Sequence, residues 1–536
     1  MFRISDRFFL WVSVCIGLLV FALILFRAAN LSVTFDESGT FDVLAASYTD
    51  VLFAKRFFQS ANNHILNSIL LKLSASVFGN SELALRLPNV LSYIFYFLGS
   101  FIISRECSQN NWIRIMGVVL FSSIVYVLDF FSLARGYGLA TGFELFSIAM
   151  MILHYKDRKE SYLFLTFLFA ALSVYSNFTW LNFFVPLWAV YNLLLYVQVN
   201  DIALFLKKSL VSNWIPIVLA LILFSLSYIP IRYLRMQDEF RWGANGWFDS
   251  LHRFASDFLY DHNFLNAVIF QVLLISMVVA ASLIIFRTFK LNKNMLPRMR
   301  YLFFITSLIL MIVLATVVQR NVLGMMYMDG RKALMYFPLV ICLLILLLNS
   351  FSEVKPNLVA GLSILLIGLS VFNFSSRLKV NSVREWWFDE NSREVAYYIH
   401  DHPVNGKRDL AVTWYFSESI RYYNQYKLDI SIKRLIKMTD REDIHEFAYY
   451  YVLGDDIRDV PPMYKPLFRF GWDRILLVKD SMNYNTQKGF LLTEIEGLEE
   501  MAETEKSNIL DSMLLRQRKE IDWTKIPVTN GDIWKL

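Results

Sequence analysis

The feature that most constrains this chain is a series of apolar blocks, each long enough to cross a lipid bilayer. A transmembrane helix needs about 20 predominantly apolar residues, and roughly eleven blocks of the sequence approach this length. Only 18% of the 536 residues are charged, whereas a soluble protein carries about a quarter. We therefore predict a multi-spanning α-helical membrane protein. The blocks cover approximately residues 8–28, 87–104, 113–131, 136–154, 161–177, 181–199, 212–234, 264–286, 301–319, 333–349 and 357–374.

The loops between the blocks indicate how the chain crosses the membrane. The first block is too long for a cleaved signal peptide, and no small-residue cleavage site follows it, so we expect it to be retained as a span. Lys and Arg are denser in the short loops that lie inside if the N-terminus is cytoplasmic, which favours that orientation. The C-terminal part is then extracytoplasmic. The formal charge of +6 reflects this loop bias and does not indicate nucleic-acid binding.

Two expected outer loops, residues 29–86 and 235–263, are long. In the first loop, residues 41–58 and 65–78 carry apolar side chains at helical spacing, with lysines between them. Both segments are too short and too polar to cross the membrane. We predict amphipathic helices that lie in the interface.

The composition changes after the last block. Residues 378–536 are charged and rich in Tyr and Trp, and this length suffices for one domain. The alternation of strand and helix patterns predicts a small α/β domain, separate from a transmembrane domain over residues 1–377. None of the three cysteines falls in it, so it holds no disulfide. Strands are expected at 410–416, 449–453 and 474–478, and helices at 392–399, 417–426 and 439–447.

The strongest candidate for chemistry is the acid pair Asp36-Glu37, which follows the first span directly. Two adjacent carboxylates in a loop are more often simply hydrated. At the membrane surface, however, a carboxylate can deprotonate an acceptor hydroxyl or amine while a lipid phosphate departs from the other side of a sugar. The position of the pair therefore favours a general base.

Polar residues in the rest of the first outer loop form a second group of candidates. Asn63, His64 and Asn67, with Asn62 before them, occupy neighbouring faces of an expected helix. Arg86 and Pro88 open the second span, where proline fits the first turn. A structural role for Arg86 is at least as plausible as a role in ligand binding.

Two basic elements at span ends complete the candidates. Arg135-Gly136-Tyr137 lies at the tip of a helical hairpin, where an arginine commonly just extends to the headgroups. Arg331 and Lys332 precede the tenth span, and a helix start with basic side chains binds phosphate well. A simple interfacial anchor is an equally good interpretation of this second element.

Together these motifs resemble the GT-C glycosyltransferases, in particular bacterial relatives of the protein O-mannosyltransferases and of the lipid A aminoarabinose transferase. The resemblance covers the topology of residues 1–375 and is most specific over 35–138. The matching elements are Asp36-Glu37, Asn-Asn-His-Ile-Leu-Asn (62–67), Phe-Gly-Asn-Ser-Glu (78–82), Arg-Leu-Pro (86–88), Ala-Arg-Gly-Tyr (134–137) and Gly-Arg (330–331).

The resemblance implies an inverting transfer from a polyprenyl-phosphate sugar on the outer face of the inner membrane, to a glycolipid, glycan or protein. It implies Asp36 as general base, with Glu37 in support or on the acceptor. Many relatives have His-Pro-Pro where this chain has His64-Ile65-Leu66, which puts the local backbone in doubt. Some relatives hold a divalent cation, for which His64 and His262 are the candidate ligands. The other roles implied are donor-phosphate binding by Arg331, Arg135 and Lys332, and substrate binding by His64, Asn63, Asn67, Arg86 and Tyr137.

Three other kinds of protein fit parts of this pattern. A transporter or flippase of lipid-linked substrates is the main alternative, although such proteins commonly show internal repeats or charges near the bilayer midplane. A glycan polymerase or ligase of another fold also uses lipid-linked donors. A non-catalytic scaffold that displays the C-terminal domain is the third.

Overall fold

The computed structural model describes residues 5–54, 63–199, 201–291, 297–428, 435–437, 447–460, 463–471 and 473–480. The chain divides into two compact units. One comprises Met1–Asn30 with Asp42–Val380, and the other comprises Leu31–Phe41 with Asn381–Leu536. The boundary lies at 380/381, where 377/378 was expected, and the division differs from the expected one in a second respect. The segment that carries the acid pair groups with the C-terminal unit and not with the helices that flank it in sequence.

The first unit is a bundle of membrane-crossing helices, as predicted. In the described part of the chain, eight helices are long and apolar enough to span, or nine if a pair bent by 57° counts as one. The pair is α6 and α7, and it bends at Ile124. Two further predicted blocks form the shorter apolar helices α9 and α16, of 17 and 16 residues. The eleven helices or pairs are α1 (Asp6–Asn30), α5 (Glu82–Cys107), α6 (Asn111–Ser123) with α7 (Val125–Phe131), α8 (Gly136–Asp157), α9 (Glu160–Ser176), α10 (Leu181–Val199), α12 (Trp214–Met236), α14 (Phe264–Leu291), α15 (Pro297–Leu323), α16 (Tyr336–Phe351) and α17 (Pro356–Arg377).

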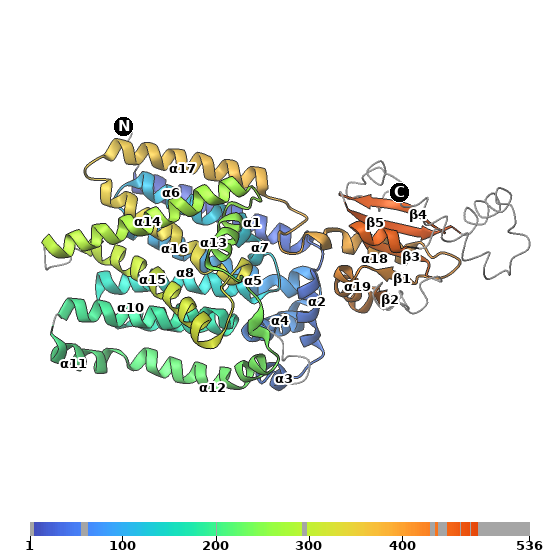
Figure 1. The fold of residues 1–536 in the computed structure, drawn as a ribbon, viewed down its shortest axis with the longest axis horizontal. Helices are drawn as coiled ribbons and strands as arrows, with labels where there is room; N and C mark the ends of the chain where they lie inside the picture. Colours follow the sequence, from blue (N-terminus) through green and yellow to red (C-terminus); the bar gives the residue numbers. More distant parts are fainter. Residues whose placement is uncertain are drawn as a thin grey trace, which may run out of the picture. The chain divides into compact units, whose positions relative to one another are not determined.

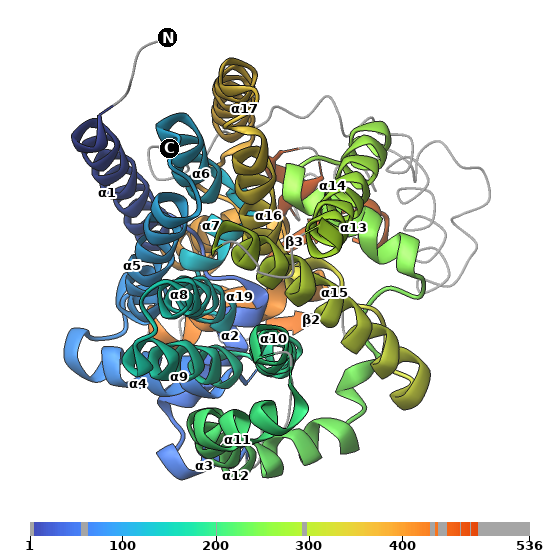
Figure 2. The ribbon, with the colours of Figure 1, turned by 90° about the vertical axis from the view of Figure 1, so that its left-hand side faces the viewer.

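The spans run side by side, and α8 lies at the centre of the bundle (Figures 1 and 2). Within its most apolar window, 89% of the residues of α8 are buried, against 6% for α14 and 17% for α17. The peripheral helices therefore present their apolar side chains outward, which suits contact with lipid tails. Neighbouring elements therefore pack around the first turn of α8, and they restrict the motion of the side chains on that turn.

The first outer loop is built of short helices. In its described part these are α2 (Phe35–Phe41), a 3₁₀ turn η1 (Asp42–Leu44), α3 (Tyr48–Leu52) and α4 (Ile65–Phe78). The predicted helix at 65–78 is therefore confirmed. The one predicted at 41–58 is divided between η1 and α3, and its last residues, like Asn62, lie outside the described residues.

Pro88 does not lie in the first turn of its span, as we had predicted, because α5 already begins at Glu82. A proline inside a helix leaves the carbonyl four residues earlier without its usual donor. Here the Ser74 hydroxyl donates to that carbonyl, of Ala84, so the helix continues past Pro88.

The second outer loop and the ends of the spans add short elements. They are η3 (Phe178–Trp180), α11 (Ile202–Ser212), η4 (Glu239–Arg241), α13 (Trp247–Leu259) and η5 (Gly330–Ala333). An isolated antiparallel bridge between Ala244 and Tyr327 ties the second outer loop to the strand-like segment before η5.

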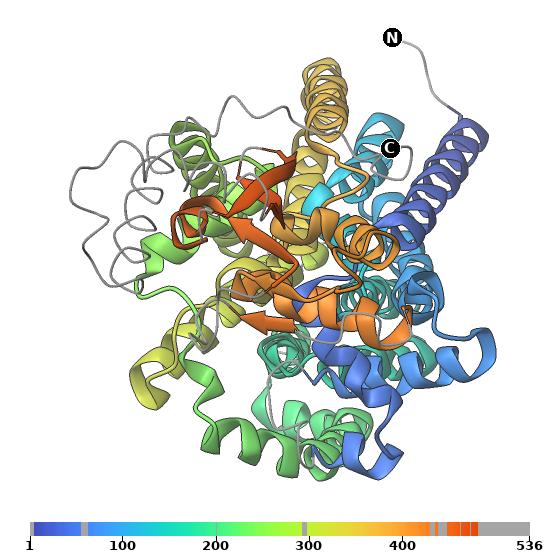
Figure 3. The same ribbon diagram turned by 90° about the vertical axis from the view of Figure 1, so that its right-hand side faces the viewer.

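The C-terminal unit is a small α/β domain, as predicted. Its five-stranded sheet has the order β2-β1-β3-β5-β4; β1 is parallel to β2 and β3, and the β4–β5 pair is antiparallel. Figures 1 and 3 show α18 and α19 beside the sheet. The elements are η6 (Trp387–Asn391), α18 (Ser392–Asp401), β1 (Leu410–Val412), α19 (Trp414–Tyr426), β2 (Leu435–Lys437), β3 (Tyr449–Leu453), η8 (Gly454–Asp459), β4 (Tyr464–Phe470) and β5 (Arg474–Lys479).

Both faces of this sheet are covered. On one face Tyr451 stacks on Phe416 of α19, and on the other Tyr450 and Val452 join an apolar cluster with Tyr464. A strand that is buried on both faces reads as a continuous apolar run, as 449–453 does. The predicted strands at β3 and β5 are confirmed, the predicted β1 is shorter because α19 starts at Trp414, and the helix expected at 439–447 falls outside the described residues.

Candidate functional site

The acid pair lies in the first turn of α2, where the two carboxylates have different surroundings. Both the backbone N–H and the hydroxyl of Thr34 donate to Oε2 of Glu37, at 3.0 and 3.2 Å. A Glu side chain that reaches back to the backbone N–H three residues earlier makes one half of a capping box, which stabilises a helix start. Glu37 is fully buried, and Asp36 is 7% exposed. Glu37 therefore holds the turn on which Asp36 is carried.

A third carboxylate, far away in the sequence, supports the same turn. Asp389 of η6 accepts the backbone N–H of Phe35 through Oδ2 at 2.7 Å. The Phe35 ring also meets Trp414 edge-on, with 5.8 Å between centroids. Two more hydrogen bonds fix the segment before α2: the N–H of Val33 donates to the Tyr423 hydroxyl, and the Ser419 hydroxyl donates to the carbonyl of Val33. The C-terminal unit thus positions the acid pair.

Burial favours the protonated, neutral form of Asp389. The pKa of this carboxyl is raised well above its ordinary value, mainly because it is buried, although the N–H of Phe35 and the Ser392 hydroxyl act in the opposite direction. The negative charges of Glu37 and Asp36 raise it further. The folded protein therefore holds a proton on Asp389 over a pH range in which the unfolded chain has released it.

This difference predicts a pH-dependent stability. Because the folded state binds more protons than the unfolded state, the free energy of unfolding decreases as pH rises through the raised pKa. Asp389→Asn keeps an oxygen acceptor for Phe35 but does not ionise, so we expect it to flatten this decrease and to be more stable than the wild type at alkaline pH. Thermal unfolding in detergent, followed by tryptophan fluorescence from pH 5 to pH 9, measures both.

Asp389→Ala is the matched variant, since it removes the acceptor as well as the charge. A buried N–H without a partner costs about 1–3 kcal/mol, so this variant should be destabilised at every pH. If Asp389→Asn and the wild type showed the same pH dependence, Asp389 would not be the group responsible.

In the helical unit, four of the predicted residues meet around one aromatic ring. The ring of Tyr137, in the first turn of α8, is contacted edge-on by His64 with 4.9 Å between centroids. The guanidinium of Arg135 lies 6.0 Å from the same ring and that of Arg331 lies 5.8 Å from it. The three residues come from the start of α4, the start of α8 and η5. We call His64, Arg135, Tyr137 and Arg331 the basic cluster.

Burial and the neighbouring charges keep the imidazole of His64 neutral. The pKa of its imidazole is lowered well below the ordinary 6.5, chiefly by burial and then by Arg135 and Arg331. The ring is therefore neutral at physiological pH, and its Nε2 has no hydrogen-bond partner among the described residues. A neutral imidazole beside two guanidinium groups is suited to an anion that carries hydroxyl or acidic protons.

Buried polar contacts fix the turn that carries Arg135 and Tyr137. The Asn67 amide donates to the carbonyl of Ala134 at 3.1 Å, and Asn89 donates to Asn67 at 2.6 Å while accepting the N–H of Leu139 at 3.1 Å. The predicted candidate Asn67 thus braces the turn. Asn89 was not predicted, although its place inside an apolar block could have drawn attention to it.

Trp180 supports the other side of the Tyr137 ring. Its indole contacts that ring edge-on at 6.4 Å, and its Nε1 donates to Glu144 at 2.7 Å. Both Trp180 and Glu144 are fully buried. The spans are therefore not free of charge-bearing residues, but in α8 the carboxyl serves to hold this tryptophan.

Gly136 allows these elements to approach each other. A Cβ at this position would overlap the carbonyl oxygen of Ser176 and lie 2.6 Å from the Cβ of His64. The nearest obstacle is thus the backbone at the end of α9.

We therefore expect Gly136→Ala to destabilise the protein by about 1–3 kcal/mol, because the nearest obstacle is backbone that cannot move aside as a side chain would. Thermal unfolding in detergent measures the loss. Gly361→Ala in α17 is the control, since nothing lies within 4 Å of its Cβ position and alanine favours a helix. Equal stability of the two variants would contradict the tight approach.

The remaining predicted residues lie elsewhere. Lys332 donates to the carbonyl of Trp242, and Arg86 is fully buried and donates to the carbonyl of Ala28 at 3.0 Å. Asn63 accepts the Ser68 hydroxyl at 3.1 Å. These contacts give each of them a structural task.

The described residues do not favour a metal site. They contain no group of three or more His, Cys, Asp or Glu side chains that could hold an ion. His64 has two arginines as its charged neighbours, which oppose a cation, and His262 is exposed in the loop between α13 and α14.

A buried ion pair near the end of α1 was also missed. Arg27 contacts Asp129 of α7 at 2.6 Å, and the Tyr260 hydroxyl donates to the other oxygen of Asp129 at 2.9 Å. Both charged residues lie within or at the edge of predicted apolar blocks, which was the available signal. The network ties α1 and α7 to the end of α13.

An apolar pocket of about 220 Å³ lies among α13, α14, α15 and α16. Ala333 and Tyr336, which line it, follow Arg331 closely in the chain. Met328 and Phe254 line it from the loop side. The helical unit thus offers an apolar space next to the segment that carries one of the arginines of the basic cluster.

No protein-family model matches the chain, and no curated protein matches its sequence. Among solved structures, ArnT from Cupriavidus metallidurans bound to undecaprenyl phosphate aligns with 89% of this chain and 99% of its own, at 12% identity and a TM-score of 0.46. The apo state of the same protein aligns with 87% and 97%, at 13% identity and a TM-score of 0.44. ArnT is a GT-C lipid A aminoarabinose transferase. Because both TM-scores lie below 0.5, we rest the proposals below on this chain's own residues.

Proposed function

We propose that this protein is a GT-C type glycosyltransferase that moves a sugar from a polyprenyl-phosphate donor to a glycolipid, glycan or protein on the outer face of the inner membrane. The observation that supports this most is the basic cluster. Two arginines and a neutral histidine surround one tyrosine ring, and the segment of Arg331 leads into an apolar pocket between spans. A phosphate with an attached isoprenoid chain has the matching chemistry.

In the proposed reaction the donor phosphate binds to Arg331 and Arg135, whose guanidinium groups pair well with phosphate oxygens. Asp36 removes the proton of the acceptor hydroxyl or amine. The acceptor atom then bonds to the anomeric carbon as the bond from that carbon to the phosphate oxygen breaks, with inversion. The arginines stabilise the charge that develops on the leaving phosphate, which is commonly the largest contribution to catalysis.

We assign different roles to the three carboxylates of the C-terminal unit. Glu37 and Asp389 hold the first turn of α2, and we propose Asp36, which that turn carries, as the base. We propose that the N-terminus is cytoplasmic and that the C-terminal unit is extracytoplasmic and helps to select the acceptor, through exposed rings such as Trp387 and Trp414.

Mass spectrometry of the envelope glycans tests this function. Deletion of the gene should remove one sugar from a surface glycolipid, glycan or glycoprotein, and the wild-type gene should restore it. An unchanged set of envelope glycans, together with no consumption of any polyprenyl-phosphate sugar by the purified protein, would contradict the proposal.

A further inference from the structure

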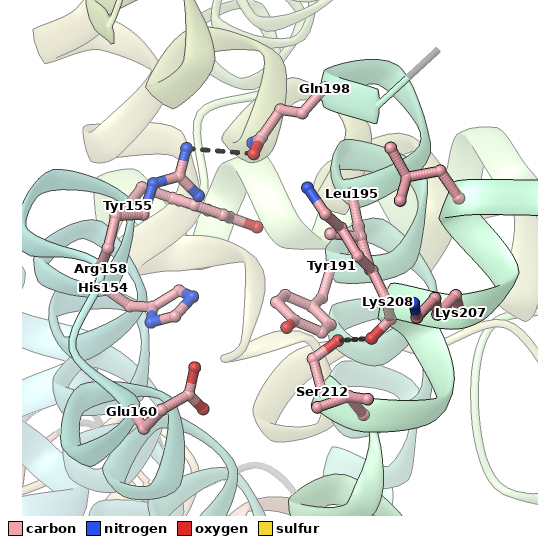
Figure 4. Close-up of a pocket in the computed structure, with 12 residues that line it drawn as sticks. His154, Tyr155, Arg158, Glu160, Tyr191, Leu195, Gln198, Lys207, Lys208 and Ser212 are labelled. Carbon is pink, nitrogen blue, oxygen red and sulfur yellow. Dashed lines mark hydrogen bonds between the residues drawn. The ribbon is translucent and has the colours of Figure 1, made fainter. Parts of the chain in front are cut away.

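A second, basic pocket lies at the other end of the spans, between α8, α9, α10 and α11 (Figure 4). Its volume of about 430 Å³ is within the range of small-ligand sites. Arg135 immediately precedes α8, whereas Tyr155 and Arg158, which line this pocket, lie at its end. A helix of 22 residues is about 33 Å long, roughly the thickness of the hydrocarbon core. The pocket therefore faces the membrane surface opposite the basic cluster.

The lining is positively charged. Lys207 and Lys208 of α11 and Arg158 after α8 contribute three permanent charges, and Glu160 is the one carboxylate among the lining residues. Arg158 donates to Gln198 of α10 at 3.0 Å, drawn as a dashed line in Figure 4, and so closes one side of the pocket. These positive charges favour the binding of an anion in the pocket.

A buried hydroxyl also points to a ligand. The side chain of Tyr155 is 3% exposed, and its oxygen has no hydrogen-bond partner in the part of the chain that the structure describes. Figure 4 shows it directed toward the space between α8 and α10. A buried hydroxyl without a partner costs free energy, which a ligand oxygen would recover.

The surroundings of the pocket favour a lipid over a soluble anion. No residue of α11 is buried, and its apolar side chains are open to the outside, with Leu210 81% and Val211 72% exposed. An amphiphile would cover this apolar surface with acyl chains while its headgroup met Lys207 and Lys208.

We propose that this pocket binds the headgroup phosphate of an anionic glycerophospholipid at the membrane face opposite the donor site. The phosphate pairs with Lys207, Lys208 and Arg158, the Tyr155 hydroxyl donates to one of its oxygens, and the acyl chains lie along α11. Basic pockets between spans commonly hold such headgroups. This binding does not depend on the proposed sugar transfer.

The test compares lipid binding to the purified full-length protein by native mass spectrometry in nanodiscs of phosphatidylcholine with increasing phosphatidylglycerol. We expect Lys207→Gln/Lys208→Gln to bind phosphatidylglycerol about 30-fold more weakly than the wild type, from about 1 kcal/mol per lysine. Tyr155→Phe, which removes only the hydroxyl, should bind about fivefold more weakly, as the loss of one hydrogen bond implies.

Arg287→Gln/Lys355→Gln is the control, because it removes two exposed charges near helix ends without touching the pocket. It should bind phosphatidylglycerol like the wild type. Equal loss in both double variants would overturn the proposal, since it would show only a general charge effect. The proposal would also be overturned if inorganic phosphate displaced phosphatidylglycerol and bound with the same affinity. Tighter binding of polyprenyl phosphate than of phosphatidylglycerol would overturn it as well. Thermal unfolding in phosphatidylcholine alone checks that each variant is folded.

Discussion

Asp36→Asn should reduce sugar transfer by about 10²- to 10⁴-fold, the usual contribution of a positioned general base, while leaving the protein folded and inserted. Asn has nearly the same size but cannot accept the proton of the acceptor. The rate of transfer from a polyprenyl-phosphate sugar, measured with the purified protein in proteoliposomes, gives the effect. The loss should appear in kcat and only weakly in the donor KM, since the donor phosphate is held by other residues.

Glu37→Gln is the matched variant for this experiment. Its amide oxygen can still accept the N–H and hydroxyl of Thr34, so both hydrogen bonds that hold the turn persist. We expect it to lose less than about tenfold, because Glu37 acts by holding the turn. A larger loss in Glu37→Gln than in Asp36→Asn would exchange the roles of the two carboxylates, and full activity of Asp36→Asn would refute the assigned base.

The second large effect is expected at Arg331. Replacing one donor to a developing negative charge commonly costs about 10²- to 10³-fold in rate, so Arg331→Gln should fall in this range. Arg331→Lys keeps the charge but loses the planar fork and should recover only part of the activity. Initial rates over a series of donor concentrations separate the effect on binding from the effect on kcat.

Lys332→Gln is the control at the neighbouring position. The Lys332 ammonium donates a hydrogen bond to the carbonyl of Trp242. The loss of one such bond should lower the rate by about fivefold or less. Comparable defects in Arg331→Gln and Lys332→Gln would mean that the whole turn η5, and not the contact with the ring of Tyr137, sets the activity.

The membrane-spanning helices could be predicted from the sequence because each is encoded by its own continuous run of apolar residues. Each apolar block is complete in itself, and each coincides with a helix or a bent pair. The strands β3 and β5 were found for the same reason, since both are short runs of apolar residues. The β2 and β4 strands were not predicted, and β4, which contains Pro466, alternates too irregularly to stand out.

The candidate site was predictable in its residues but not in its connections. Arg135, Tyr137 and Arg331 were identified from span ends, yet only the fold shows that they meet around one ring. Asp389 was invisible as a partner of Phe35 because 354 residues separate them in sequence. Asn67 was predicted to bind substrate, and the fold adds its hydrogen bonds to Ala134 and Asn89, which the sequence does not show. Long-range contacts of this kind leave no periodic signal.

The long-range hydrogen bonds within the C-terminal unit indicate a structural role for it. Its residues 381–536 carry no motif that indicates chemistry, but they fix the segment of the acid pair through Asp389, Ser419 and Tyr423. A variant without residues 381–536 would therefore lose the contacts that support the turn of Asp36.

The central claim is that this protein consumes a polyprenyl-phosphate sugar and that Asp36 is needed for that step. Mass spectrometry of the polyprenyl-phosphate sugar pool in a deletion strain, complemented with the wild-type gene or with Asp36→Asn, tests it most directly. One polyprenyl-phosphate sugar should accumulate in the deletion strain and in the Asp36→Asn strain, and should return to its normal level with the wild-type gene. A pool that is identical in all three strains would contradict the account.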